Sequence, residues 1–116
     1  MNLNDYAREC HDDNLKWWRD PRTNEPINRN FGELIALMHS ELSEALEGDR
    51  KNLMDDKLPH RKMVEVELVD CLIRLFDAAG ARGYDLEGAY QEKRKFNAQR
   101  ADHKPENRVL PGGKAY

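Results

Sequence analysis

The sequence has few cysteines and no long apolar run, and both shortages limit what it can encode. Its two cysteines, Cys10 and Cys71, belong to no CxxC pair, which argues against a disulfide framework or a zinc finger and favours a reducing compartment. No segment approaches the roughly 18 consecutive apolar residues of a membrane span, and the N-terminus lacks the basic start and apolar core of a signal peptide. We therefore expect a cytoplasmic protein with no membrane partner.

A surplus of positive charge is also missing. Lysine and arginine number 19 against 22 aspartates and glutamates, a net charge of -3. Stable nucleic-acid binding requires a basic surplus to neutralise phosphates, so we expect none here. The balance still leaves room for a local basic pocket that binds a small phosphate ligand. With 116 residues, of which 39% are hydrophobic, the chain is long enough for one globular domain with one core.

The spacing of apolar residues predicts an all-α protein, because they recur every three or four positions and no stretch alternates as a strand would. The predicted helices cover approximately residues 3–18, 30–48, 60–79 and 85–101. We expect the first to be capped by Asn2 or Asn4, the second by Asn30 and the fourth by Asp85. Gly48 and the pair Gly80 and Gly83 are predicted helix ends, and Pro59 is predicted in the first turn of the third helix.

These four helices predict a small four-helix bundle. We expect residues 1–104 to form a single helical domain, and residues 105–116, which contain prolines and glycines, to form an irregular tail. The third predicted helix is apolar over most of its circumference, which is typical of a helix that is central to a bundle or shared with a second subunit. Since the chain is also short, a homodimer is the minimal expectation.

Two pairs of acidic residues stand on consecutive predicted helices. Glu41 and Glu44 lie on the second, and Glu67 and Asp70 lie on the third. Residues three apart project from nearly the same face of a helix, so opposed pairs would place four carboxylates around one small volume. Hard divalent cations, Mg²⁺ above all and Mn²⁺ as an alternative, take such oxygen ligands. A metal in turn favours an oxygen-rich, phosphorylated substrate.

The two pairs differ in what their position indicates. Glu41 interrupts the apolar stripe formed by Leu34, Leu37, Met38, Leu42 and Ala45, where an ionised carboxylate costs several kcal/mol unless it is compensated. Glu67 and Asp70 share a polar strip with Arg74 and Asp77. That strip is equally compatible with a helix face in contact with water.

With these motifs, the sequence resembles the MazG-like, all-α nucleoside triphosphate pyrophosphohydrolase superfamily. The family signature is ExxE, a spacer and ExxD, matched here by Glu41-x-x-Glu44 and Glu67-x-x-Asp70. The segment Glu92-Lys93-Arg94-Lys95-Phe96-Asn97-Ala98-Gln99-Arg100 also resembles the family's Lys, Asn and Arg after the third helix. The likeness covers roughly residues 30–103, while residues 49–58 and the tail after Lys104 have no counterpart.

The resemblance implies a Mg²⁺-dependent enzyme that cleaves a (deoxy)nucleoside triphosphate between the α- and β-phosphates, releasing the monophosphate and pyrophosphate. It implies that Glu41, Glu44, Glu67 and Asp70 hold the metal and that the oligomer is a dimer or tetramer. Glu41 or Glu44 is our choice for the carboxylate that orients or deprotonates water. The cations of Lys93 and Arg100 would bind phosphates, and Asn97 would fix a sugar or base edge.

The adjacent residues Trp17 and Trp18 point in different directions on a helix, so one of them is expected in the core. The other could stack on a nucleobase, and we assign that role to Trp18, with Asn14 one turn earlier as a second substrate contact. Two other interpretations stay open. One is a non-catalytic helical adaptor or regulatory protein that binds a cation at the acidic residues. The other is a dUTP-specific or phosphoribosyl-nucleotide pyrophosphohydrolase.

Overall fold

The structure is a computed structural model that describes residues 1–100 and 105–113. Over those residues the protein is helical, and its β contacts are limited to two isolated bridges, Arg19–Pro26 and Met54–Lys62. The all-α prediction is therefore confirmed for the part of the chain that is described. None of the helices there has the length and apolarity to cross a membrane. The chain divides into two compact units, residues 1–84 and 85–116.

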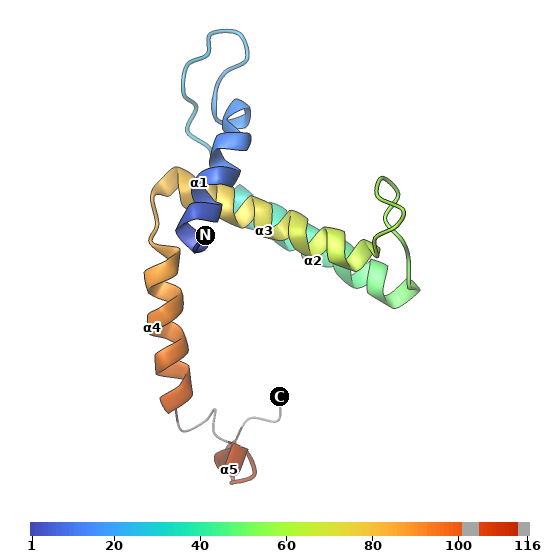
Figure 1. Ribbon diagram of the computed structural model, residues 1–116, viewed down its shortest axis with the longest axis vertical. Coiled ribbons are helices and arrows are strands. Elements are labelled where there is room, and N and C mark those ends of the chain that lie inside the picture. The colour runs from blue at the N-terminus through green and yellow to red at the C-terminus, as the bar shows by residue number, and fades with distance from the viewer. Residues whose placement is uncertain (101–104, 114–116) are drawn as a thin grey trace. The chain divides into compact units, whose positions relative to one another are not determined.

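Three helices build the first unit. Helices α2 (Phe31–Lys51) and α3 (Met63–Arg82) run side by side in opposite directions, and α1 (Leu3–Asp13) packs against α3 (Figure 1). The long contact between α2 and α3 brings the two predicted acidic pairs onto facing helices. The fold of this unit therefore decides whether those carboxylates meet.

The first predicted helix is broken at Asn14. Helix α1 begins at the predicted cap Asn2, whose side chain accepts the Asp5 backbone N–H while Asp5 accepts the Asn2 N–H in return. It ends at Asp13, and a separate 3-10 helix, η1 (Leu15–Trp18), carries both tryptophans. The Asn14 side-chain amide donates to the Cys10 carbonyl at 2.8 Å. This local bond competes with continued helix and redirects the two indoles.

Helix α2 begins as predicted but does not end at Gly48. Its cap is Asn30, whose side chain accepts the Glu33 N–H, and the helix continues to Asn52, which adopts the left-handed conformation with φ 51°. Gly48 is buried inside the helix, where an added Cβ would lie 2.8 Å from the Met63 Cγ. The glycine therefore permits close approach of α2 and α3 rather than terminating the helix.

The predicted bounds of the third helix were also wrong at its start. Helix α3 begins at Met63, so Pro59 lies in the preceding loop and not in the first turn. The predicted terminator Gly83 does cap the helix, with φ 66°. Gly80 lies inside α3, where a Cβ would stand 2.4 Å from the Ala7 carbonyl oxygen of α1. Here too a glycine permits a close helix crossing.

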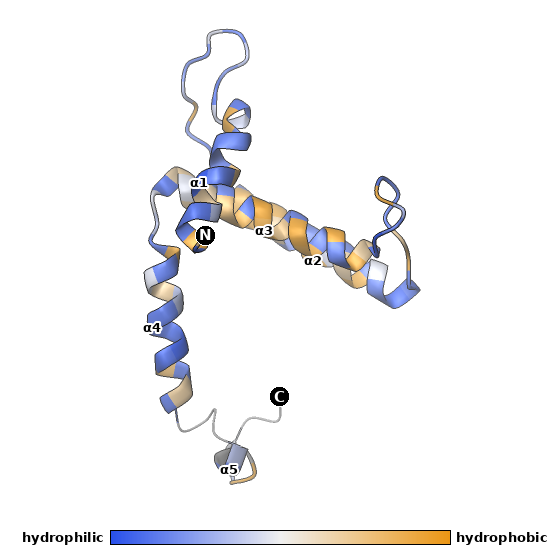
Figure 2. Cartoon of the chain, in the orientation of Figure 1, coloured by the Kyte–Doolittle hydropathy of each residue, from blue (hydrophilic) through white to orange (hydrophobic). Residues whose placement is uncertain are grey.

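The apolar core of the first unit is small. Its centre is Leu34, Met38 and Ala78, with Trp18, Phe31 and Cys71 packed against it. Leu42, predicted in the buried stripe of α2, is 47% exposed. Figure 2 colours many residues of α2 and α3 as hydrophobic. Several of the large apolar residues of the two helices are exposed in the single chain: Ile35, Leu42, Leu46, Leu68, Val69, Leu72, Ile73 and Leu75.

The second unit contains α4 (Leu86–Gln99) and a four-residue helix, α5 (Pro105–Arg108). Helix α4 begins at the predicted cap Asp85, whose carboxylate accepts the Gly88 N–H at 3.0 Å. Helix α4 ends at Gln99, two residues before the predicted end at about residue 101. The end of the predicted domain at Lys104 and the last three residues of the tail lie outside the described residues. The single-domain boundary at 104 stays a prediction.

Candidate metal centre

Three of the four predicted acidic residues form one cluster between α2 and α3. Glu41, Glu67 and Asp70 each offer a carboxylate oxygen, and these atoms lie within 4.8 Å of one another. Glu41 is 9% exposed and Glu67 is 8% exposed. Polar groups this deeply buried need a partner, because losing water costs a carboxylate several kcal/mol. We call these three residues, with the adjoining Glu44, the acidic cluster.

Glu67 is the member of the acidic cluster whose environment is least satisfied. Its Oε2 is buried and no hydrogen-bond partner for it is found among the described residues. As an ionised carboxylate it faces other carboxylates and no donor. The alternative in which Glu67 lies on a solvated helix face is wrong, because this side chain points into the interface with α2.

The electrostatics of the acidic cluster oppose its full ionisation. Burial, together with hydrogen bonding of a shared proton to Glu41 and Glu44 and repulsion by their charges, raises the pKa of Glu67 to about 8. Burial and the charge of Glu41 also raise the pKa of Asp70, against the opposing effect of Arg74. The cluster therefore retains a proton at neutral pH unless another positive charge enters it.

Arg74 and Glu44 lie at the border of the cluster. The Arg74 Nε donates to the Glu41 Oε1 at 3.1 Å, so Glu41 has one cationic partner while Glu67 has none. Glu44 is exposed and belongs with Glu41, Glu67 and Asp70 to the wall of a cavity of about 750 Å³. Glu44 thus borders the same volume without entering the tight group of three.

Asp55 is a further buried acid that sequence analysis did not single out. It lies in the loop between α2 and α3, is 7% exposed and lines the same cavity. Its carboxylate accepts the backbone N–H groups of Lys57 and Leu58 at 3.0 and 2.8 Å. An Asp that bonds the backbone two and three residues ahead is typical of a turn. Asp55 therefore shapes the loop beside the acidic cluster, and its charge contributes to the raised pKa of Asp70.

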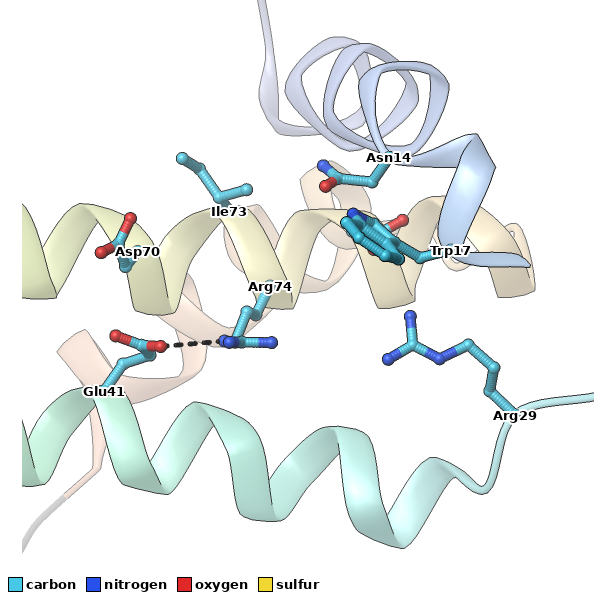
Figure 3. Close-up of a pocket in the computed structure, with 8 residues that line it drawn as sticks. Asn14, Trp17, Arg29, Glu41, Asp70, Ile73 and Arg74 are labelled. Atoms are coloured by element: carbon cyan, nitrogen blue, oxygen red, sulfur yellow. Dashed lines mark hydrogen bonds and ion pairs between the residues drawn. The ribbon is translucent and has the colours of Figure 1, made fainter. Parts of the chain in front are cut away.

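A second cavity, of about 480 Å³, adjoins the acidic cluster on the side of η1. Figure 3 shows Glu41 and Asp70 at one end of this cavity and Trp17 and Arg29 at the other, with Arg74 between them. Asn14 also lines it, as expected of a substrate contact. The indole of Trp17 is 58% exposed. We call this space the η1 cavity.

The structure gives Trp18 a different environment from Trp17. The Trp18 Nε1 donates to the Asp77 Oδ1 at 2.9 Å, and the His11 Nδ1 lies 2.9 Å from the same oxygen. Trp18 packs against the core cluster. Of the two adjacent indoles it is therefore Trp17, and not the preferred Trp18, that lines the cavity beside Glu41.

Two of the three predicted phosphate and sugar contacts, Lys93 and Asn97, lie on α4 in the second unit, whereas Arg100 follows the helix as its C-cap residue. The Lys93 ammonium and the Arg100 guanidinium lie 4.8 and 5.8 Å from the centroid of the Phe96 ring. The Asn97 Oδ1 is buried and has no hydrogen-bond partner within the described part of the chain. Lys93 and Asn97, four residues apart, lie near one side of the helix axis, whereas Arg100 has an extended conformation with ψ 133°. The role of all three toward a substrate stays a prediction.

No family model, curated protein or solved structure matches the chain. The resemblance to the MazG-like superfamily therefore stays a prediction that depends on the motifs alone.

Proposed function

We propose that the protein is a Mg²⁺-dependent nucleotide pyrophosphohydrolase that cleaves a (deoxy)nucleoside triphosphate between the α- and β-phosphates. Support comes from one observation above all. A buried glutamate, Glu67, has an oxygen for which residues 1–100 and 105–113 provide no hydrogen-bond partner, and it lies with Glu41 and Asp70 in a group whose oxygens approach within 4.8 Å.

The donor set fits a hard divalent cation. It consists of carboxylate oxygens, which Mg²⁺ and Mn²⁺ prefer, and it contains neither thiolate nor imidazole. Burial, and after it the repulsion between the carboxylates, raises the pKa of Glu67 and Asp70. A positive charge placed among these residues would favour their ionised forms. Glu41, Glu67 and Asp70 would hold the ion directly, and Glu44 would complete the ligand set from the cavity wall.

The bound ion would supply charge neutralisation of the phosphates and a more acidic water. Side chains of the protein would bind the phosphates and activate the water. Arg74, beside Glu41, carries a guanidinium that suits phosphate oxygens. Glu44 is exposed at the rim and is therefore better placed than a fully coordinated carboxylate to orient water or accept its proton.

The η1 cavity supports a nucleotide as the substrate. Glu41 and Asp70 lie at one end of this cavity and Trp17 lies at the other. A nucleotide has the matching order of groups, from metal-bound phosphates through the sugar to the base. Trp17 offers an exposed indole face on which a base can stack. This proposal gives the stacking role to Trp17 and keeps Asn14 as a contact. Lys93, Asn97 and Arg100 remain our choice for further phosphate and sugar contacts.

We further propose that the protein is a homodimer or homotetramer. Leu46, Leu68 and Val69 are each about half exposed in the single chain (59%, 46% and 49%). Large apolar side chains exposed in this number favour burial against another subunit. A cytoplasmic location is part of the same proposal.

The proposed function is tested by measuring pyrophosphate release from the common ribo- and deoxyribonucleoside triphosphates with Mg²⁺ or Mn²⁺. We expect metal-dependent release that Glu41→Gln abolishes while the helical circular-dichroism spectrum is unchanged. Glu47→Gln, which removes a half-exposed carboxylate of the same helix that pairs with Lys51, is the matched control and should keep full activity. Activity that survives Glu41→Gln would overturn the assignment. Silence on every nucleotide, together with stabilisation by metal, would favour the metal-binding adaptor instead.

A further inference from the structure

The η1 cavity holds two arginines with separate tasks. Arg74 donates to Glu41 and so belongs to the acidic end. Arg29 lies at the other end of the cavity, beside Trp17 (Figure 3). If phosphates occupy the acidic end, as the proposed function requires, Arg29 is the cation at the end left for the base.

Arg29 packs on the ring of Trp18, and Trp18 is in turn held by a hydrogen bond to the buried residue Asp77. Asp77 is 8% exposed and accepts the indole N–H of Trp18 at 2.9 Å. The guanidinium of Arg29 lies 4.9 Å from the centroid of the Trp18 ring. Stacking on an aromatic face restrains the planar guanidinium without using its N–H donors. Its fork of donors therefore remains available to a ligand in the cavity.

Trp17 and Arg29 together offer a base two kinds of contact. The exposed indole of Trp17 can stack on any base, because every base has a π face. The Arg29 fork discriminates, because all its polar hydrogens are donors and it pairs with two adjacent acceptors. Guanine and hypoxanthine present such a pair, O6 and N7. Adenine presents an amino donor beside N7, so the fork distinguishes 6-oxopurines from adenine.

We propose that the η1 cavity selects 6-oxopurine over adenine nucleotides, and that Arg29 is the specificity-determining residue. This inference rests on the proposed function for the placement of the phosphates at Glu41 and Asp70. Asp77 and Trp18 act as positioning residues that hold Arg29 in place.

The test compares kcat/KM for pyrophosphate release from GTP, ITP, ATP, CTP and UTP. A bidentate contact of this type discriminates by about tenfold or more, so GTP and ITP should exceed ATP by at least that factor. Arg29→Ala should reduce the ratio to within about threefold, by lowering the values for GTP and ITP while the value for ATP stays unchanged. Arg22→Ala, in the exposed loop before Arg29, removes the same charge outside the cavity and should leave the ratio unchanged.

Two outcomes of the kinetic test would overturn the inference while leaving the hydrolase proposal intact. One is equal turnover of the five nucleotides by the unaltered protein. The other is an equal loss for all five in Arg29→Ala, which would make Arg29 a phosphate contact.

If no nucleotide releases pyrophosphate, the proposed function fails and a binding measurement decides the inference separately. Calorimetric titration with GMP, IMP and AMP then serves as the probe. Tighter binding of GMP and IMP that Arg29→Ala removes would support the selection of 6-oxopurines. Equal affinities, or no binding of any of the three, would overturn it.

Discussion

Replacing Glu67 by glutamine should stabilise the metal-free protein at alkaline pH and remove its response to metal. The folded protein holds a proton at Glu67 up to about pH 8, whereas the unfolded chain releases it near the ordinary value of 4.5. Between these values the folded state binds more protons, so stability is greatest below 4.5 and falls as pH rises toward 8. The proton belongs to the acidic cluster as a whole, since Glu41 and Glu44 interact with it.

The size of this effect follows from the pH window. For each pH unit over which the folded state holds one extra proton, the free energy of unfolding falls by about 1.4 kcal/mol. Over the whole window from pH 4.5 to about 8 it therefore falls by several kcal/mol. A domain of this length changes its melting temperature by about 4 °C for each kcal/mol. Glutamine keeps the shape of Glu67 without the charge. The variant should therefore lose most of the decline in melting temperature between pH 5 and pH 8.5.

The assay is thermal unfolding in EDTA across that pH range, repeated with Mg²⁺ and with Mn²⁺. At pH 8.5 the metal-free Glu67→Gln variant should melt above the unaltered protein, and added metal should raise the melting temperature of the unaltered protein only. Glu65→Gln, an exposed carboxylate two residues away, is the control and should behave as the unaltered protein does. Parallel pH profiles for the two proteins, or a less stable Glu67→Gln at pH 8.5, would refute the reasoning.

Three other changes test the packing around the site. Asp77→Ala should destabilise the protein by about 1–3 kcal/mol in urea unfolding, because the buried indole N–H of Trp18 loses its acceptor; an unchanged midpoint would contradict this. Gly80→Ala should destabilise by about 2 kcal/mol despite the better helix propensity of alanine, since the new Cβ meets the Ala7 carbonyl at the helix crossing; a gain in stability would show that the crossing relaxes freely. Leu72→Glu should lower the sedimentation mass to that of a monomer, and a protein that is monomeric without the substitution would refute the proposed oligomer.

The sequence correctly predicted that Glu41 is buried, because this charged residue interrupts an apolar stripe on its helix. A carboxylate among Leu34, Met38 and Ala45 has to be buried with the helix face that carries it, whatever the helix packs against. Glu67 offered no such conflict, since its neighbours on α3 include other polar residues. Only the packing of α2 against α3 decides that Glu67 is 8% exposed.

The helix ends show why local signals mislead. Glycine is favoured both at a left-handed helix end and at a close contact between helices. Gly83 serves the first purpose, whereas Gly48 and Gly80 serve the second. The sequence alone does not separate these roles, because the contacting atoms come from Met63 and Ala7, distant in the chain.

The loop residue Asp55 and the choice between the two tryptophans depended on tertiary contacts. Asp55 precedes Lys57 and Leu58 in a pattern that indicates a turn, but the pattern does not place that turn beside the acidic cluster. Trp17 and Trp18 differ by one position, and the change from α1 to η1 at Asn14 alters which indole faces the cavity. A continuous helix over residues 3–18 would have pointed the two indoles in other directions.

Titration of the protein with Mn²⁺, followed by the electron paramagnetic resonance signal of the free ion, measures most directly whether the carboxylates from α2 and α3 bind a divalent cation. We predict saturable binding of at least one ion per chain, competition by Mg²⁺, and loss of that binding in Glu67→Gln but not in Glu65→Gln. Mn²⁺ that stays free in the presence of the unaltered protein, or equal binding by the two variants, would contradict the account.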